Sequence, residues 1–158
     1  MLFIDEGDVL RRDANMKRGK IDQILGKNKR FCIPMAALGE AVHMVRRKHP
    51  GKDKYGPILE ELNRLLDSGF LEVRFINDPE ATFRLAREIS TMYQDSRDRI
   101  SPMDALIVAS AATDQGCVSF YTADSQLISN SNLAGRIHQW RSDAGYNQMK
   151  IGSVSNLR

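Results

Sequence analysis

Four acidic residues lie at regular places beside the apolar segments of this chain: Asp5, Glu40, Asp104 and Asp124. The first ends the apolar run of residues 1–4, and the last closes the run of residues 118–122. The middle two lie close to the starts of apolar stretches with helical spacing. In a doubly wound parallel sheet, the carboxyl ends of strands and the helix starts that follow them share one edge, where ligands bind. The spacing therefore predicts four carboxylates at a common edge.

Mutual repulsion of these carboxylates indicates the chemistry that they could perform. Two unit charges about 4 Å apart interact by roughly 4 kcal/mol at an effective dielectric constant near 20. Such a cluster persists only where protons or a cation offset the charge, and hard oxygen ligands favour Mg²⁺ or Mn²⁺. The four residues thus predict a metal-dependent phosphoryl-transfer site.

Each of the four also has a purely structural interpretation. The first and the last can be turn residues or helix N-caps. Glu40 can be a solvated side chain paired with Arg47 or His43. The segment Ser101-Pro102-Met103-Asp104 has capping-box spacing, with proline at the first helical position. Each signal is weak by itself, so the hypothesis depends on the four residues together.

Apolar runs and helix signals alternate along the chain, as in an α/β fold. Strands are predicted at residues 1–5, 31–33, 70–76 and 117–122. Helices are predicted in two short pieces over 9–25, then over 34–48, 57–67, from 78 onward, from 101 to about 115, and briefly from 125. Residues 136–140 and 149–154 could each be a strand or a terminal arm. The alternation predicts a parallel sheet that is covered on both faces.

Within the helix predicted at 34–48, the core-facing stripe is expected to consist of Leu38, Ala41, Val42 and Val45. Glu40 then belongs to the opposite face, among small residues. A ligand or another segment could approach closely there, which favours a functional role for Glu40.

Length and composition are those of one globular domain, which we expect to span 1–158 with its core at about 1–130 and an uncertain segment at 131–158. Of the 158 residues, 42% are hydrophobic and 27% are charged. No apolar run approaches the roughly 18 residues of a membrane span, and the first run is too short for a signal peptide. Cys32 and Cys117 are interpreted as reduced core residues. We therefore expect a cytoplasmic protein with no membrane association.

Positive charge is concentrated in the first third of the chain. The net charge is +3, yet residues 1–56 hold 13 of the 23 Lys and Arg and only 7 of the 20 Asp and Glu. Clustered basic residues beside an acidic metal site suit a polyanionic substrate. The alternative interpretation is an ordinary solvated surface.

The chain resembles the PIN domain family, and in particular the VapC-like ribonucleases of prokaryotes. The resemblance extends from residue 1 to about 130 and rests on four segments in order: Phe3-Ile4-Asp5 with Val9-Leu10, Ile33-Pro34 through Leu38-Gly39-Glu40, Ser101-Pro102-Met103-Asp104-Ala105-Leu106-Ile107-Val108-Ala109-Ser110-Ala111, and Tyr121-Thr122-Ala123-Asp124. The third and fourth segments are the most specific. One departure is the turn Asp5-Glu6-Gly7-Asp8-Val9, where the family usually has Asp-x-Asn before Val or Ile.

This resemblance implies a three-layer α/β/α fold and Mg²⁺- or Mn²⁺-dependent cleavage of single-stranded RNA. It also implies frequent homodimers and, for toxin members, an antitoxin protein that blocks the site. The family's acidic positions correspond to Asp5, Glu40, Asp104 and Asp124, and its hydroxyl position before the last carboxylate corresponds to Thr122.

We therefore predict a metal-dependent endoribonuclease in which the four carboxylates bind one or two cations. The metal would polarise the scissile phosphate and activate a water for in-line attack, while Thr122 would orient Asp124 or that water. Arg11, Arg12 and Arg46 are candidates for contacts with RNA phosphates.

Two other functions remain open. The acidic cluster could serve stability, dimerisation or RNA binding in a non-catalytic module, which the altered turn after Asp5 favours. A structure-specific DNA nuclease would need the same metal site, but the chain lacks the long insertions expected for gripping a duplex.

Overall fold

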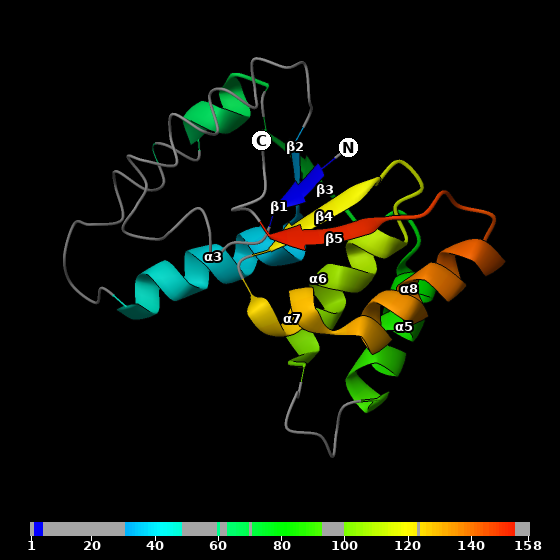
Figure 1. The fold of residues 1–158 in the computed structure, drawn as a ribbon. Helices are drawn as coiled ribbons and strands as arrows, with labels where there is room; N and C mark the ends of the chain where they lie inside the picture. Colours follow the sequence, from blue (N-terminus) through cyan, green and yellow to red (C-terminus); the bar gives the residue numbers. More distant parts are fainter. Residues whose placement is uncertain are drawn as a thin grey trace.

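The computed structural model of the chain describes residues 2–4, 31–48, 60, 63–69, 71–92, 100–122 and 124–153. Its strands and helices, labelled as in Figure 1, are β1 (Leu2–Ile4), β2 (Phe31–Pro34), α3 (Met35–Lys48), β3 (Leu71–Arg74), α5 (Pro79–Met92), α6 (Pro102–Ala112), β4 (Ser119–Thr122), α7 (Ser125–Ser129), α8 (Ser131–Asp143) and β5 (Lys150–Ser153). Residues 60 and 63–67 are also helical.

The five strands form one sheet in the order β3-β2-β1-β4-β5, and all four neighbouring pairs are parallel. The predicted α/β class with a parallel sheet is confirmed. Strand β1 is central, because its Phe3 lies opposite Cys32 of β2 and Phe120 of β4. The chain builds the sheet outward from β1 in one direction through β3, and in the other through β4 and β5. Strands β1 and β4 therefore flank the topological switch point, where α/β folds bind ligands at the carboxyl ends of strands.

Helices α5, α6, α7 and α8 lie below the sheet in the view of Figure 1. Helix α6 packs most extensively against α5 and also contacts α3 and β2. It is buried on most sides because its inward residues are small or branched: Ala105, Ile107, Val108, Ala109, Ala111 and Ala112. Small side chains let neighbouring helices and strands approach closely. The helices predicted over residues 9–25 lie outside the described residues.

Proline starts two of these helices, as the sequence predicts. Pro79 opens α5, and the Asp78 carboxylate accepts the Ala81 N–H at 2.9 Å. Pro102 is the first residue of α6, and Ser101 is its N-cap. Proline suits this position because the missing N–H would have no partner inside the helix. The predicted end of the helix near residue 67 is also confirmed, with Gly69 at a φ of 70°.

Several predicted boundaries differ by a few residues. Strand β3 ends at Arg74, and Phe75, which was assigned to it, is 69% exposed. Helix α3 begins at Met35 because Pro34 still belongs to β2. There Pro34 is the last residue of the strand and lies opposite Arg74 of β3.

Helix α6 ends at Ala112 rather than near residue 115, because the turn of Thr113 to Gly116 follows it. Strand β4 accordingly begins at Ser119. Cys117 is fully buried, as predicted, but precedes the strand. Among residues 35–43 of α3, whose burial is described, Ala37 and Ala41 are buried. The core-facing stripe is therefore shifted from the predicted one, in which Leu38 and Val42 prove to be half-buried.

The uncertain C-terminal segment contributes two elements. Residues 136–140 belong to α8, so both interpretations proposed for them, strand or arm, are wrong. Leu133, Ile137 and Arg141 are buried at helical spacing along its inner face. Residues 150–153 form β5, which pairs with β4 and confirms the strand interpretation for that segment.

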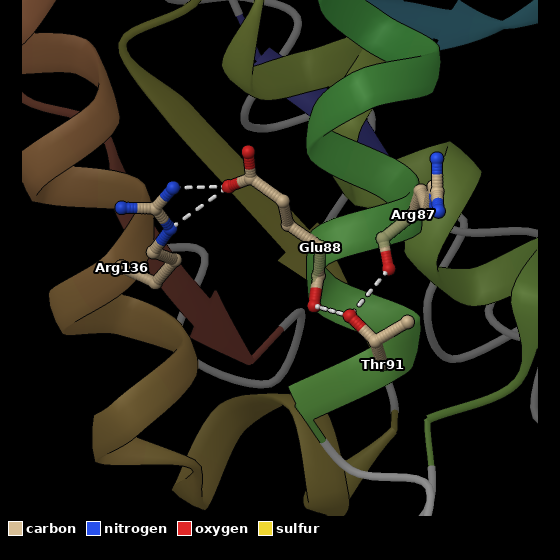
Figure 2. A network of polar contacts seen from close by, with 4 residues as sticks. All are labelled: Arg87, Glu88, Thr91 and Arg136. Atoms are coloured by element: carbon tan, nitrogen blue, oxygen red, sulfur yellow. Dashed lines mark hydrogen bonds and ion pairs between the residues drawn. The ribbon is translucent and has the colours of Figure 1, made fainter.

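An ion pair joins α8 to α5 (Figure 2). Arg136 contacts the Glu88 carboxylate through both Nε and Nη2, with Nε at 3.1 Å. On the next turn of α5, the Thr91 hydroxyl is within 3.0 Å of the carbonyl oxygens of Arg87 and Glu88. Both charged side chains of the pair are about one-third exposed, so solvent screens the interaction and limits its contribution.

The Arg141 guanidinium is fully buried, and all five of its N–H donors face backbone carbonyls. Nη1 donates to Ala112 and Asp114 at 2.7 and 3.0 Å, and Nη2 to Gln115 and Cys117 at 3.5 and 2.9 Å. Nε donates to Asn147 at 2.5 Å. These bonds connect α8 to the end of α6, to the segment leading into β4 and to the segment leading into β5.

Replacing Arg141 with Met should lower the free energy of unfolding by about 3 kcal/mol or more. The substitution removes a charged donor from several buried carbonyls, which then lack a partner. Urea denaturation of the wild type and the variant measures the loss. Arg141→Lys should give an intermediate value because lysine keeps the charge with three donors.

The matched control is Arg136→Met, which removes an arginine of the same helix whose ion pair is partly exposed. It should cost at most about 1 kcal/mol. Equal losses for Arg136→Met and Arg141→Met would show that the buried carbonyl contacts add nothing.

Burial raises the pKa of the Cys117 thiol to about 12, from an ordinary value of 9.0. Its sulfur lies 3.4 Å from the Met149 sulfur and 3.5 Å from the Ser119 carbonyl oxygen. Both cysteines are free thiols and both are buried, as predicted for reduced core residues. Burial also raises the pKa of Cys32.

The raised pKa of Cys117 predicts a loss of stability at alkaline pH. Between about pH 9 and pH 12 the unfolded chain has released the thiol proton while the folded protein keeps it. The free energy of unfolding therefore falls as the pH rises through this window. Urea denaturation at pH 8 and at pH 10.5 should show a larger decrease for the wild type than for Cys117→Ala. Cys32 and the other titrating groups remain in both proteins, so identical decreases would contradict the assignment.

Candidate functional site

Glu40 is the sixth residue of α3 and lies at the border between the buried and exposed faces of that helix. Its neighbours Ala37 and Ala41 are buried, whereas His43 is exposed. The side chain is half-buried, and its Oε2 atom is shielded from solvent. This enclosure argues against the interpretation of Glu40 as a fully solvated surface residue. Gly39, beside it, is exposed, and none of the described residues lies within 4 Å of the position that a Cβ would take.

Asp104 is the third residue of α6 and is half-buried. Its backbone N–H donates to the Ser101 hydroxyl at 3.1 Å, and that hydroxyl donates to Asp104 Oδ2 at 2.5 Å. The predicted capping interaction is therefore present. In addition, the carboxylate is held by the capping side chain itself.

Asp124 follows β4 and is the N-cap of α7, as the structural interpretation of this residue predicts. Its Oδ1 accepts the Gln126 N–H at 2.8 Å. Its own backbone N–H donates to Thr122 Oγ1 at 3.0 Å, and Thr122 is fully buried at the end of β4. The hydroxyl of Thr122 therefore fixes the turn that presents Asp124.

The remaining predicted site residues are less completely described. Asp5 follows Ile4, the last residue of β1, but lies outside the described residues, as do Arg11 and Arg12. Arg46 belongs to α3. Within the described part of the chain, no group of three or more Asp, Glu, His or Cys side chains could hold a metal ion. Glu40, Asp104 and Asp124 thus do not form a metal site by themselves.

The donor set nevertheless suits a hard divalent cation. The candidates are carboxylates; the Ser101 hydroxyl bonds to that of Asp104, and the Thr122 hydroxyl accepts the backbone N–H of Asp124. Both cysteines are buried in the core, so their sulfur atoms are not available as soft metal ligands. Oxygen ligands of this kind favour Mg²⁺ or Mn²⁺. Asp5 would have to complete such a site.

Ser101 has two contacts at the start of α6, and the sequence predicted only one of them. The Ser-Pro-x-Asp spacing identifies it as a helix cap, and the structure confirms that role. Its hydroxyl bond to the Asp104 carboxylate was not predicted, since a capping box would place that carboxylate on the backbone N–H of residue 101.

Among the described residues, none of the helices combines the length and hydrophobicity that a membrane crossing requires.

Comparison with known proteins identifies the family of this chain. The family model of the PIN domain matches residues 9–132, which is well over half of the sequence. The match includes Glu40, Asp104, Thr122 and Asp124, and it begins just after Asp5. No curated protein matches the chain. With a parallel sheet of order β3-β2-β1-β4-β5 and a family match over most of its length, the chain belongs to the PIN domain family.

Proposed function

We propose that this protein is a Mg²⁺- or Mn²⁺-dependent endoribonuclease that hydrolyses phosphodiester bonds of single-stranded RNA. PIN domains are typically nucleases, which supports hydrolysis of a nucleic acid. The observation that carries the proposal is the placement of three predicted carboxylates, Glu40, Asp104 and Asp124, inside the family match. Each is at least partly withdrawn from solvent near a helix start or within the first turns of a helix.

In this proposal, Asp5, Glu40, Asp104 and Asp124 hold the cation. When bound, the cation supplies Lewis-acid polarisation of the scissile phosphate and charge neutralisation. The chain's own residues then have positioning tasks. Asp104 is held by Ser101 at the start of α6, and Asp124 is held by the Gln126 N–H at the start of α7. Thr122 is fully buried, which supports orientation of Asp124 rather than direct contact with water.

The basic first third of the chain supports RNA as the polyanionic substrate. Arg11, Arg12 and Arg46 are proposed to hold phosphates, because phosphate contacts position a nucleic acid without reading its sequence. We also propose a homodimer and an antitoxin partner, both of which rest on the resemblance to VapC-like ribonucleases. A cytoplasmic location is proposed from the two free, buried thiols.

Asp104→Asn tests the assignment of Asp104 as a metal ligand. The substitution keeps the size of the side chain and removes its charge. A residue with only a capping role should lose at most about 1 kcal/mol of stability and little activity. We expect instead a loss of at least 100-fold in cleavage of a mixed RNA pool with Mn²⁺, in a protein that remains folded. EDTA should abolish cleavage by the wild type.

The control is Asp78→Asn, since Asp78 is another acidic residue at a proline-initiated helix start, where its carboxylate accepts the Ala81 N–H. It should retain cleavage. Near-wild-type cleavage by a folded Asp104→Asn protein would remove Asp104 from the site. An inactive wild type under every metal condition would favour a non-catalytic module.

Arg11 and Arg12 provide a separate test of RNA binding. Replacing both with Gln should weaken binding of single-stranded RNA and reduce the slope of log K against log salt by roughly 1 to 1.5, because each phosphate contact on a single strand contributes about 0.7. Mn²⁺ binding should not change. Fluorescence anisotropy with labelled RNA from 50 to 300 mM salt measures the slope, and an unaltered slope would assign both arginines to the solvated surface.

A further inference from the structure

We propose that Ser101 is a positioning residue of the metal site, acting through Asp104. This inference rests on the proposed function, since it concerns how one of the proposed ligands is held. The observation is a pair of hydrogen bonds between these two residues. The Ser101 hydroxyl donates to Asp104 Oδ2 at 2.5 Å, and the Asp104 backbone N–H donates to the Ser101 hydroxyl at 3.1 Å.

This pairing goes beyond an ordinary helix cap. An N-cap needs only to accept an N–H from the first turn, and the Ser101 hydroxyl does so with its oxygen lone pair. The hydroxyl proton remains for a second bond. Ser101 donates it to the carboxylate of Asp104, the residue whose N–H the hydroxyl accepts. Asp104 is thereby held at two points, its backbone and its carboxylate, by one hydroxyl.

The environment makes this restraint effective. Ser101 and Asp104 are both half-buried, so water competes only partly for the hydroxyl and the carboxylate. Pro102 follows Ser101 and restricts it to the extended conformation in which it is found, at φ −64° and ψ 152°. The backbone therefore restricts the donor residue, and the hydrogen bond restrains the Asp104 carboxylate before a cation arrives.

A metal site gains affinity from such preorganisation. Groups that orient ligands typically change metal affinity or activity by 10- to 100-fold when they are removed. Ser101 should accordingly matter more for Mn²⁺ affinity than for the stability of the fold. A residue that only caps α6 would show the opposite.

The two roles separate in Ser101→Gly. Glycine is a tolerated N-cap and should cost only a few tenths of a kcal/mol relative to serine, but it removes the hydroxyl donor from Asp104. We expect calorimetric titration of the metal-free protein to show a Kd for Mn²⁺ that is about 10- to 100-fold higher than that of the wild type. Ser101→Thr keeps the hydroxyl and should restore the Kd to within a few-fold.

Asp78→Gly is the matched control, because Asp78 also precedes a proline and accepts an N–H three residues later, at 2.9 Å. It should leave the Kd for Mn²⁺ unchanged. A Kd for Ser101→Gly within twofold of the wild type, with Asp104→Asn greatly weakened, would overturn the role of Ser101 and leave the metal site intact. Failure of the wild type itself to bind Mn²⁺ would overturn the metal site and the role of Ser101 together.

Discussion

A fully buried guanidinium, that of Arg141, holds together the elements on which the candidate site depends. It bonds to carbonyls at the end of α6 and in the segment that leads into β4. The opposite ends of those two elements carry the proposed functional residues, with Asp104 at the start of α6 and Thr122 at the end of β4. Joining the near ends restricts the relative placement of the far ends. Arg141 thus contributes to the site without belonging to it.

Burial of that charge is tolerable because the surrounding groups offset it. An isolated buried cation costs several kcal/mol, and burial does lower the pKa of Arg141. The carbonyls at a helix C-terminus carry partial negative charge, and two of the bonds lie at or just beyond the end of α6. The Tyr146 ring lies 5.5 Å from the guanidinium and stacks edge-on with Trp140. Since residue 141 lies beyond the family match, the segment that follows the match completes the core of this protein.

The sequence predicted most elements because proline, glycine and apolar spacing act locally. Pro79, Pro102 and Gly69 mark helix ends through their own backbone restrictions, whatever packs around them. Residues 136–140 were assigned wrongly because the decisive inward residue of their helix is the charged Arg141, which no apolar pattern counts as core. In the candidate site, the acidic residues could be selected from their spacing along the sequence. The bond from Ser101 to Asp104 could not, because it depends on where a hydroxyl proton points.

The N-terminal caps of α5 and α6 are alike, but only the cap of α6 also contacts a candidate site residue. At both α5 and α6, a capping residue precedes a proline, and its side chain accepts the N–H of the third helical residue. In α5 that third residue is Ala81, so the cap has only a structural task. In α6 it is Asp104, whose carboxylate also accepts a hydrogen bond from the Ser101 hydroxyl at 2.5 Å. The cap that begins the helix therefore also fixes an anionic group at a partly buried helix start. An aspartate as the third helical residue thus gives this cap a second bond, to the carboxylate that we propose as a metal ligand.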